Sequence, residues 1–148
     1  MKLYANKLEM LALLACILSQ SPAAAQLNEQ ACMFRTCSVG AIVSTVPGSK
    51  ALPVCATAPI TSYVHFVWMN PDRRQEREPI FVQAEDRLRA YAAVNSYEDA
   101  LKSCSVLKSR VIGRVVENGP AKSGLLLVAP RDGRSPFWVS NLDTEPVL

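Results

Sequence analysis

Four cysteines constrain the fold of this chain more than any other feature of its sequence. They are Cys32, Cys37, Cys55 and Cys104, and all of them follow the apolar N-terminal run. An even number of cysteines in a small exported domain indicates disulfides, because compartments outside the cytoplasm oxidise thiols and a small core gains stability from cross-links. We therefore expect two disulfides. Three pairings are possible, and in each of them Cys104 closes a loop of roughly 50 to 70 residues.

Cys32 and Cys37 could instead form a redox site or a metal site. A thioredoxin-like site has two residues between its cysteines at the start of a helix, where the helix dipole lowers the thiol pKa; here four residues separate them. Zinc ligands usually come in close pairs, and the only histidine, His65, supplies no second pair. We favour structural disulfides, and we expect no metal and no cofactor.

The N-terminus has the layout of a secretory signal peptide. Basic residues come first, a short apolar run extends from Met10 to Leu18, and small residues end at Ala25. Residues 1–25 are therefore the expected leader, and residues 26–148 form one exported domain. A membrane anchor needs about 20 apolar residues, roughly twice the length of this run. Lipidation at Cys16 is a further alternative, but it would leave too short an apolar run for export.

The charge of the exported part is nearly balanced. Of 16 basic and 13 acidic residues, Lys2, Lys7 and Glu9 fall in the leader, which leaves 14 and 12 and a net charge of +2. A dedicated nucleic-acid binder normally has a clustered basic face, so we expect no nucleic-acid partner. After the leader we expect no membrane span, and the sequence has no Asn-x-Ser/Thr glycosylation site. This fits a bacterial exported protein.

The N-terminal half of the exported part reads as strands. Residues 38–46 and 52–57 flank a Pro-Gly turn signal, which predicts a hairpin that carries Cys55. Residues 60–69, ITSYVHFVWM, have β-branched and aromatic side chains at both alternating sets of positions, which predicts a central strand. Residues 70–79 combine prolines with mixed charges and predict an exposed loop. Residues 80–82 are either a short strand or the start of the next element.

Helical spacing begins further along the chain. Apolar residues recur at i, i+4, i+7 and i+8 and predict an amphipathic helix over residues 83–94. Ser96, with Asp99 three residues later, resembles a helix-capping arrangement and predicts a second helix. On that helix Cys104 would lie on the apolar face and point inward.

Three strands at regular spacing end the chain. Residues 111–116, 125–129 and 137–140 are separated by turn signals, which predicts an antiparallel meander. The expected fold class is α+β: a small single domain with an antiparallel sheet, one or two helices over about residues 83–109 and a C-terminal three-stranded meander, held by two disulfides.

His65 is the only candidate for histidine chemistry. A general base needs an orienting partner, and no aspartate or glutamate lies beside His65 in the sequence. We therefore interpret it as a structural histidine. No Gly-x-Ser-x-Gly motif is present, and a catalytic triad would have to recruit His65 from a sheet.

Two further groups are candidates for binding. Arg73, Arg74 and Arg77 could offer bidentate contacts to a carboxylate or phosphate, although a solvated connector with compensated charge is the commoner role of such a segment. Trp68 and Trp138 could form an aromatic platform for a sugar or peptide, although tryptophans at strand positions usually belong to the core.

These observations favour a small exported, non-enzymatic bacterial protein that acts by binding another protein, an envelope component or a ligand. Envelope assembly and host interaction are both compatible with it. The alternative is a small periplasmic enzyme, either a thiol oxidoreductase that uses Cys32 and Cys37 or a hydrolase that uses His65.

Overall fold

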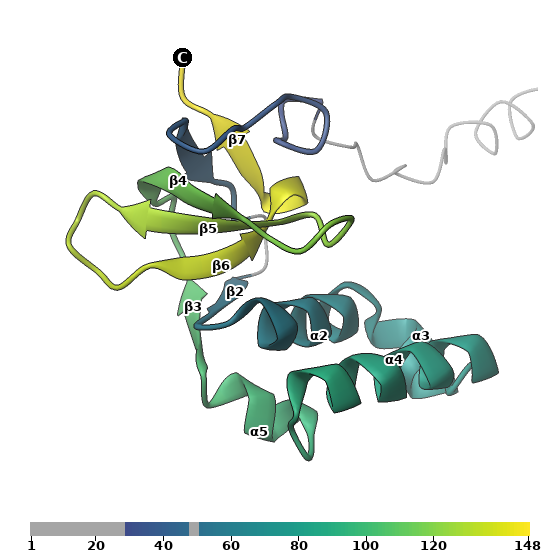
Figure 1. Cartoon of the computed structure of the whole chain (residues 1–148). Coiled ribbons are helices and arrows are strands. Elements are labelled where there is room, and N and C mark those ends of the chain that lie inside the picture. Colours follow the sequence, from purple (N-terminus) through teal and green to yellow (C-terminus); the bar gives the residue numbers. More distant parts are fainter. Residues whose placement is uncertain (1–28, 48–50) are drawn as a thin grey trace, which may run out of the picture.

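The computed structural model describes residues 29–47 and 51–148, so the expected leader lies outside the described residues. Within them the chain is α+β, as expected, with helices between the second and third strands. The elements are β1 (Ile42–Thr45), β2 (Leu52–Cys55), α2 (Ala58–Met69), α3 (Pro71–Glu76), α4 (Pro79–Ala92), α5 (Tyr97–Leu101), β3 (Cys104–Leu107), β4 (Ile112–Asn118), β5 (Leu125–Pro130), β6 (Phe137–Ser140), the 3-10 turn η1 (Asn141–Asp143) and β7 (Thr144–Pro146). Figure 1 shows helices α2 to α5 gathered on one side of the strands.

The seven strands form one antiparallel sheet in the order β3-β2-β6-β5-β4-β1-β7. Only η1 links β6 to β7, and four backbone steps span at most about 14 Å. In a flat sheet, four strand spacings would separate β6 from β7 by about 19 Å. The sheet therefore curls strongly between these two strands.

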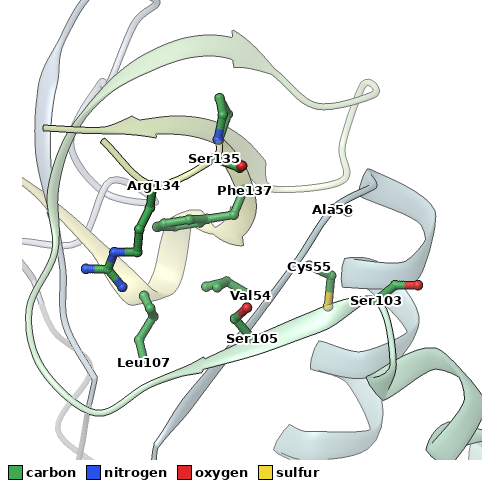
Figure 2. A pocket seen from close by; sticks show the side chains of 10 residues that line it. Val54, Cys55, Ala56, Ser103, Ser105, Leu107, Arg134, Ser135 and Phe137 are labelled. Carbon is green, nitrogen blue, oxygen red and sulfur yellow. The ribbon is translucent and has the colours of Figure 1, made fainter. Parts of the chain in front are cut away.

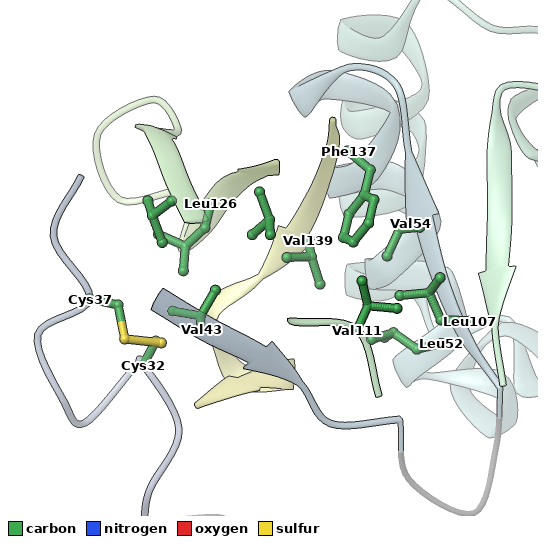
Figure 3. Close-up of a cluster of buried hydrophobic side chains, with 12 residues drawn as sticks. Cys32, Cys37, Val43, Leu52, Val54, Leu107, Val111, Leu126, Phe137 and Val139 are labelled. Carbon is green, nitrogen blue, oxygen red and sulfur yellow. A yellow bond between two sulfur atoms is a disulfide. The ribbon is translucent and has the colours of Figure 1, made fainter. Parts of the chain in front are cut away.

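The curled sheet encloses the main hydrophobic core. Four valines, one each from β1, β4, β5 and β6, are fully buried there: Val43, Val115, Val128 and Val139. Figure 3 shows the cluster, with the Cys32–Cys37 disulfide at one end and Leu52 and Leu107 at the other. One disulfide is thus part of the core itself.

β2 and β6 pair at one position only, where Cys55 lies opposite Trp138. The backbone groups of alternate residues in a strand point to the same neighbour. The next hydrogen-bonding positions of this pair would therefore include Pro53 on one side and Pro136 on the other. Because proline has no N–H to donate, the ladder ends in both directions. The two-stranded β2–β3 ribbon is consequently attached to the rest of the sheet through a single pair.

Residues 60–69 are helical, so the expected central strand is wrong. Helix α2 contacts β2 and β6 of the sheet as well as α4 and α5. Because the helix is covered on both sides, apolar residues occur all round it and imitate the pattern of a strand buried on two faces. Pro59 lies in the first turn, where a helix tolerates proline.

The expected loop over residues 70–79 is also wrong. Residues Pro71–Glu76 form α3, which ends at Arg77 in the left-handed conformation (φ 55°). Prolines at both ends were the signals for a loop, but Pro71 and Pro79 instead occupy the first turns of α3 and α4. Residues 80–82 therefore belong to a helix that begins earlier than expected, and the helix predicted over residues 83–94 is confirmed as α4.

The expected cap at Ser96 is confirmed, since its hydroxyl oxygen accepts a hydrogen bond from the Asp99 N–H at 3.1 Å. The helix that follows is shorter than expected, because Cys104 begins β3 and no helix continues to residue 109.

The expected hairpin over residues 38–57 is wrong, since β1 pairs with β4 and β7 whereas β2 pairs with β3 and β6. The C-terminal meander is confirmed as β4, β5 and β6.

Candidate functional site

Both expected disulfides are present, and the structure resolves their pairing as Cys32–Cys37 and Cys55–Cys104. The first closes a short loop, with five residues of sequence separation. The second joins β2 to β3 across neighbouring strands and has a separation of 49 residues. All four sulfurs are therefore bonded, and Cys32 and Cys37 are both buried in the core.

The Cys32–Cys37 loop displays two large apolar side chains to solvent. Met33 is 55% exposed and Phe34 is 53% exposed, and Arg35 beside them is exposed as well. The two large apolar side chains of this short loop are thus exposed, although the two cysteines that close the loop are buried in the core. We call Met33, Phe34 and Arg35 the loop tip.

Backbone hydrogen bonds fix the base of this loop to the C-terminal part of the chain. The Cys32 N–H donates to the Thr144 carbonyl at 2.7 Å, and the Met33 N–H donates to the Asn141 carbonyl at 3.1 Å. The N–H groups of the next two residues both donate to the Ala31 carbonyl, which forms a tight turn. The loop tip is therefore held in one place by a buried disulfide, a turn and two bonds to the η1–β7 segment.

The three candidate arginines differ in their surroundings. Arg73 and Arg77 are exposed on α3 and at its end. Arg74 instead faces the helical layer, where its Nε lies 3.6 Å from Glu85 Oε1 and its Cζ lies 5.0 Å above the centre of the Tyr97 ring. Of the three arginines, Arg74 is the one with an ion pair and a ring contact among the described residues.

Arg74 belongs to a network that takes one side chain from each helix. Glu85 of α4 contacts Arg74 of α3 and accepts a hydrogen bond from the Tyr63 hydroxyl of α2 at 3.4 Å. Tyr63 meets Tyr97 of α5 edge to face, with ring centroids 6.2 Å apart. Burial raises the pKa of Tyr63, and the nearby Glu85 carboxylate raises it further. Burial also raises the pKa of Tyr97, while the Arg74 charge opposes this shift.

A cleft of about 290 Å³ lies beside this network. It is lined by Val67, Trp68, Pro71, Arg74 and Tyr97, so its walls are aromatic and apolar and its one charged group is Arg74. Trp68 is half-buried there, whereas Trp138 is only 8% exposed and packs against Ala58 and Leu125. The two tryptophans therefore form no common platform.

His65 has an acidic partner, contrary to the expectation. On α2 its Nε2 lies 2.9 Å from Asp143 Oδ2 of η1, 78 residues further along the chain. Its ring is 5.9 Å from that of Trp68. Among the described residues, Asp143 is the one side chain that hydrogen bonds to this imidazole, so the pair has an orienting carboxylate but no hydroxyl or thiol in contact to serve as a nucleophile.

A second cavity, of about 280 Å³, opens where β6 separates from β2. Its floor includes Val54, Leu107 and Phe137 of the core, and Figure 2 shows Arg134 extending beside Phe137 and Leu107. The Arg134 Nε donates to Asp132 Oδ2 at 2.8 Å, and a terminal nitrogen contacts the same oxygen. Because Arg134 is paired on the rim, this cavity offers mainly apolar and hydroxyl contacts.

Within residues 29–47 and 51–148 there is no group of three or more histidine, cysteine, aspartate or glutamate side chains placed to hold a metal ion. No helix of these two segments has the length and apolar character needed to cross a bilayer.

Comparisons of the chain with protein-family models, with curated proteins and with solved structures found no match.

Proposed function

We propose that this chain is an exported bacterial protein that works by binding a partner protein through the loop tip of Met33, Phe34 and Arg35. The observation that carries the proposal is the exposure of Met33 and Phe34, each more than half accessible, on a loop closed by a buried disulfide. The two disulfides fit a protein that folds outside the cytoplasm. Residues 1–25 act as the cleaved leader, and the mature protein resides in the periplasm or outside the cell.

Preorganisation of the loop favours binding. A flexible loop loses conformational freedom when it binds, and this loss opposes association. Here the Cys32–Cys37 disulfide joins the two ends of the loop, and the Met33 N–H donates a hydrogen bond to the Asn141 carbonyl. Methionine, phenylalanine and arginine are also enriched at protein interfaces. The loop tip therefore has residue types that are enriched at interfaces. Because the loop is already ordered, it loses little conformational freedom when it binds.

The chemistry of the loop tip indicates what the partner presents. Two adjacent apolar side chains require a hydrophobic pocket, and Arg35 next to them favours a carboxylate at the rim of that pocket. The partner is accordingly a protein of the envelope or of a host with an apolar pocket bordered by aspartate or glutamate.

The enzyme alternatives receive less support. A thiol oxidoreductase attacks with an accessible, low-pKa sulfur, but Cys32 and Cys37 are buried among core side chains. A hydrolase using His65 has the orienting Asp143, but it also needs a nucleophile within hydrogen-bond reach of the imidazole. No specific observation favours either reaction over binding.

Affinity capture with matched variants tests the proposal. The mature protein is immobilised and exposed to bacterial envelope extract and, separately, to host extracellular proteins. Phe34→Ser removes one apolar side chain of the loop tip, and Ile80→Ser removes one that is 84% exposed elsewhere. We expect a partner that the wild type and the Ile80 variant retain and the Phe34 variant loses by at least about tenfold, because interface anchors contribute 2 kcal/mol or more. Equal retention by all three proteins contradicts the proposal.

Export has a separate test. Intact mass and N-terminal sequencing of the protein from the producing cell should give a chain that begins at Gln26 with no free thiol. A cytosolic protein that retains its first 25 residues and titrates with thiol reagents would exclude export.

A further inference from the structure

We propose a second binding site, independent of the loop tip: the cleft between α2, α3 and α5 binds a small aromatic carboxylate, with Arg74 holding the carboxylate and Trp68 contacting the ring. Nothing in this inference uses the Cys32–Cys37 loop, so either proposal can fail without the other.

Two contacts position Arg74 at the edge of the cleft. Its guanidinium lies over the Tyr97 ring, and its Nε edge faces Glu85 at 3.6 Å. The two terminal nitrogens make no hydrogen bond to a described residue, although the arginine borders the cleft. A guanidinium fixed by stacking and by a carboxylate at one edge presents its other donors in a planar fork that matches a carboxylate bidentately.

Glu85 limits the direction from which an anion can approach, but it does not occupy the cleft. Its Oε1 is shared between Arg74 and the Tyr63 hydroxyl, which is a buried group. Glu85 itself does not line the cleft. An incoming carboxylate reaches Arg74 from the cleft, which Glu85 does not line; the exposed Glu98 also lies close enough to Arg74 to interact with its charge.

The walls and the size of the cleft define the rest of the ligand. Trp68, Val67 and Pro71 give it aromatic and aliphatic surfaces next to the charge. Its volume of about 290 Å³ is at the low end for ligand sites. One ring with a carboxylate fits this space. Such a group occurs in free aromatic acids and at the C-terminus of a peptide that ends in phenylalanine.

Titration of the mature protein with phenylacetate tests the inference, followed by the Trp68 indole signal in NMR spectra and by tryptophan fluorescence. A ligand of this size with one bidentate contact should bind with a Kd of about 1 mM. Trp138→Phe leaves Trp68 as the only tryptophan and assigns the response. Phenylacetamide, the neutral analogue, should bind about tenfold more weakly or worse, because it lacks the charge that Arg74 recognises.

Three lysine variants separate recognition by Arg74 from general electrostatics. Arg74→Lys keeps the charge and removes the planar fork, and it should weaken phenylacetate binding about tenfold. Arg73→Lys and Arg77→Lys make the same change on the same segment outside the cleft, and they should bind like the wild type. Urea unfolding of each variant confirms that it is folded.

Several outcomes would overturn the inference. One is equal affinity for phenylacetate and phenylacetamide; another is a saturable response at the Trp138 indole in place of Trp68; a third is the absence of any saturable response in the wild type. If Arg74→Lys is unfolded, two measurements still test the inference. They are the comparison of phenylacetate with phenylacetamide and the assignment of the wild-type response to Trp68 or Trp138. A tripeptide that ends in phenylalanine, with a free or amidated C-terminus, distinguishes a peptide source from a free acid.

Discussion

His65 Nε2 lies 2.9 Å from Asp143 Oδ2, and this contact joins the helical layer to the end of the curled sheet. Both side chains are largely shielded, with exposures of 17% and 16%. His65 comes from α2 and Asp143 from η1, the turn that carries the chain from β6 to β7. The contact therefore fixes α2 against the segment on which the Cys32–Cys37 loop also rests, since that loop is hydrogen bonded to Asn141 and Thr144.

A double-mutant cycle with His65→Gln and Asp143→Asn should show a coupling free energy of about 1 kcal/mol in urea unfolding, because partly buried hydrogen bonds contribute about that much. The exposed pair Arg89–Asp86, with exposures of 42% and 57%, is the matched control and should couple by only a few tenths of a kcal/mol. Equal coupling in the two cycles would mean that the His65 contact does not join the layers.

The two disulfides should differ in their contribution to stability. In the chain-entropy treatment, closing the short Cys32–Cys37 loop contributes about 2 kcal/mol and closing the long Cys55–Cys104 loop about 4 kcal/mol. Paired substitutions to alanine, compared by urea unfolding, check the order. The Cys32/Cys37 variant should remain folded yet lose binding through the loop tip, whereas greater loss of stability from the short bridge would contradict this prediction.

Stability should fall as the pH rises above about 10. The pKa values of Tyr63 and Tyr97 are raised in the folded protein, chiefly by burial, while tyrosines of the unfolded chain ionise near pH 10. The stability that these two tyrosines contribute is therefore fully present below about pH 10, and it is lost as the pH rises through their pKa values in the folded protein. Urea unfolding over a pH series, with phenolate absorbance, measures this. A Tyr63→Phe/Tyr97→Phe double variant should show a shallower decline; an identical decline would assign the effect to other groups.

Gly113→Ala should destabilise the sheet by about 1 to 3 kcal/mol, the usual cost of overpacking a core. A Cβ at this position of β4 would lie 2.5 Å from Val128 Cγ1 and 2.6 Å from the Ala129 carbonyl oxygen. Thermal unfolding measures the loss. Adding Val128→Ala should not restore the wild-type stability, because the backbone contact remains and a cavity is created. Full tolerance of Gly113→Ala would show that β4 and β5 can separate at little cost.

The local signals in the sequence were sufficient where one element makes its own structure. The cap at Ser96, the helix α4 and the meander of β4, β5 and β6 follow from side-chain patterns within a few residues. The presence of two disulfides followed from the cysteine count. Their pairing did not, because it depends on β2 and β3 becoming neighbours across the helical segment.

The errors came from tertiary packing. Residues 60–69 contain many β-branched and aromatic residues, and their true helical state is set by burial between the sheet and two helices. The spacing of Thr61, Val64 and Val67, together with Pro59 in the first turn, was the available helical signal. No pattern in the sequence could have paired His65 with Asp143 or placed Arg74 beside Trp68, since these contacts require the complete arrangement of elements.

The Cys55–Cys104 bond has a topological consequence. All four described helices lie between these two cysteines, so the bond encloses them in a covalent ring that leaves the sheet and returns to it at the same point. A protease that hydrolyses one peptide bond inside this ring releases nothing, and both pieces stay attached until a reductant acts. Such a nicked form would keep both pieces together and would gain only the mass of one water molecule.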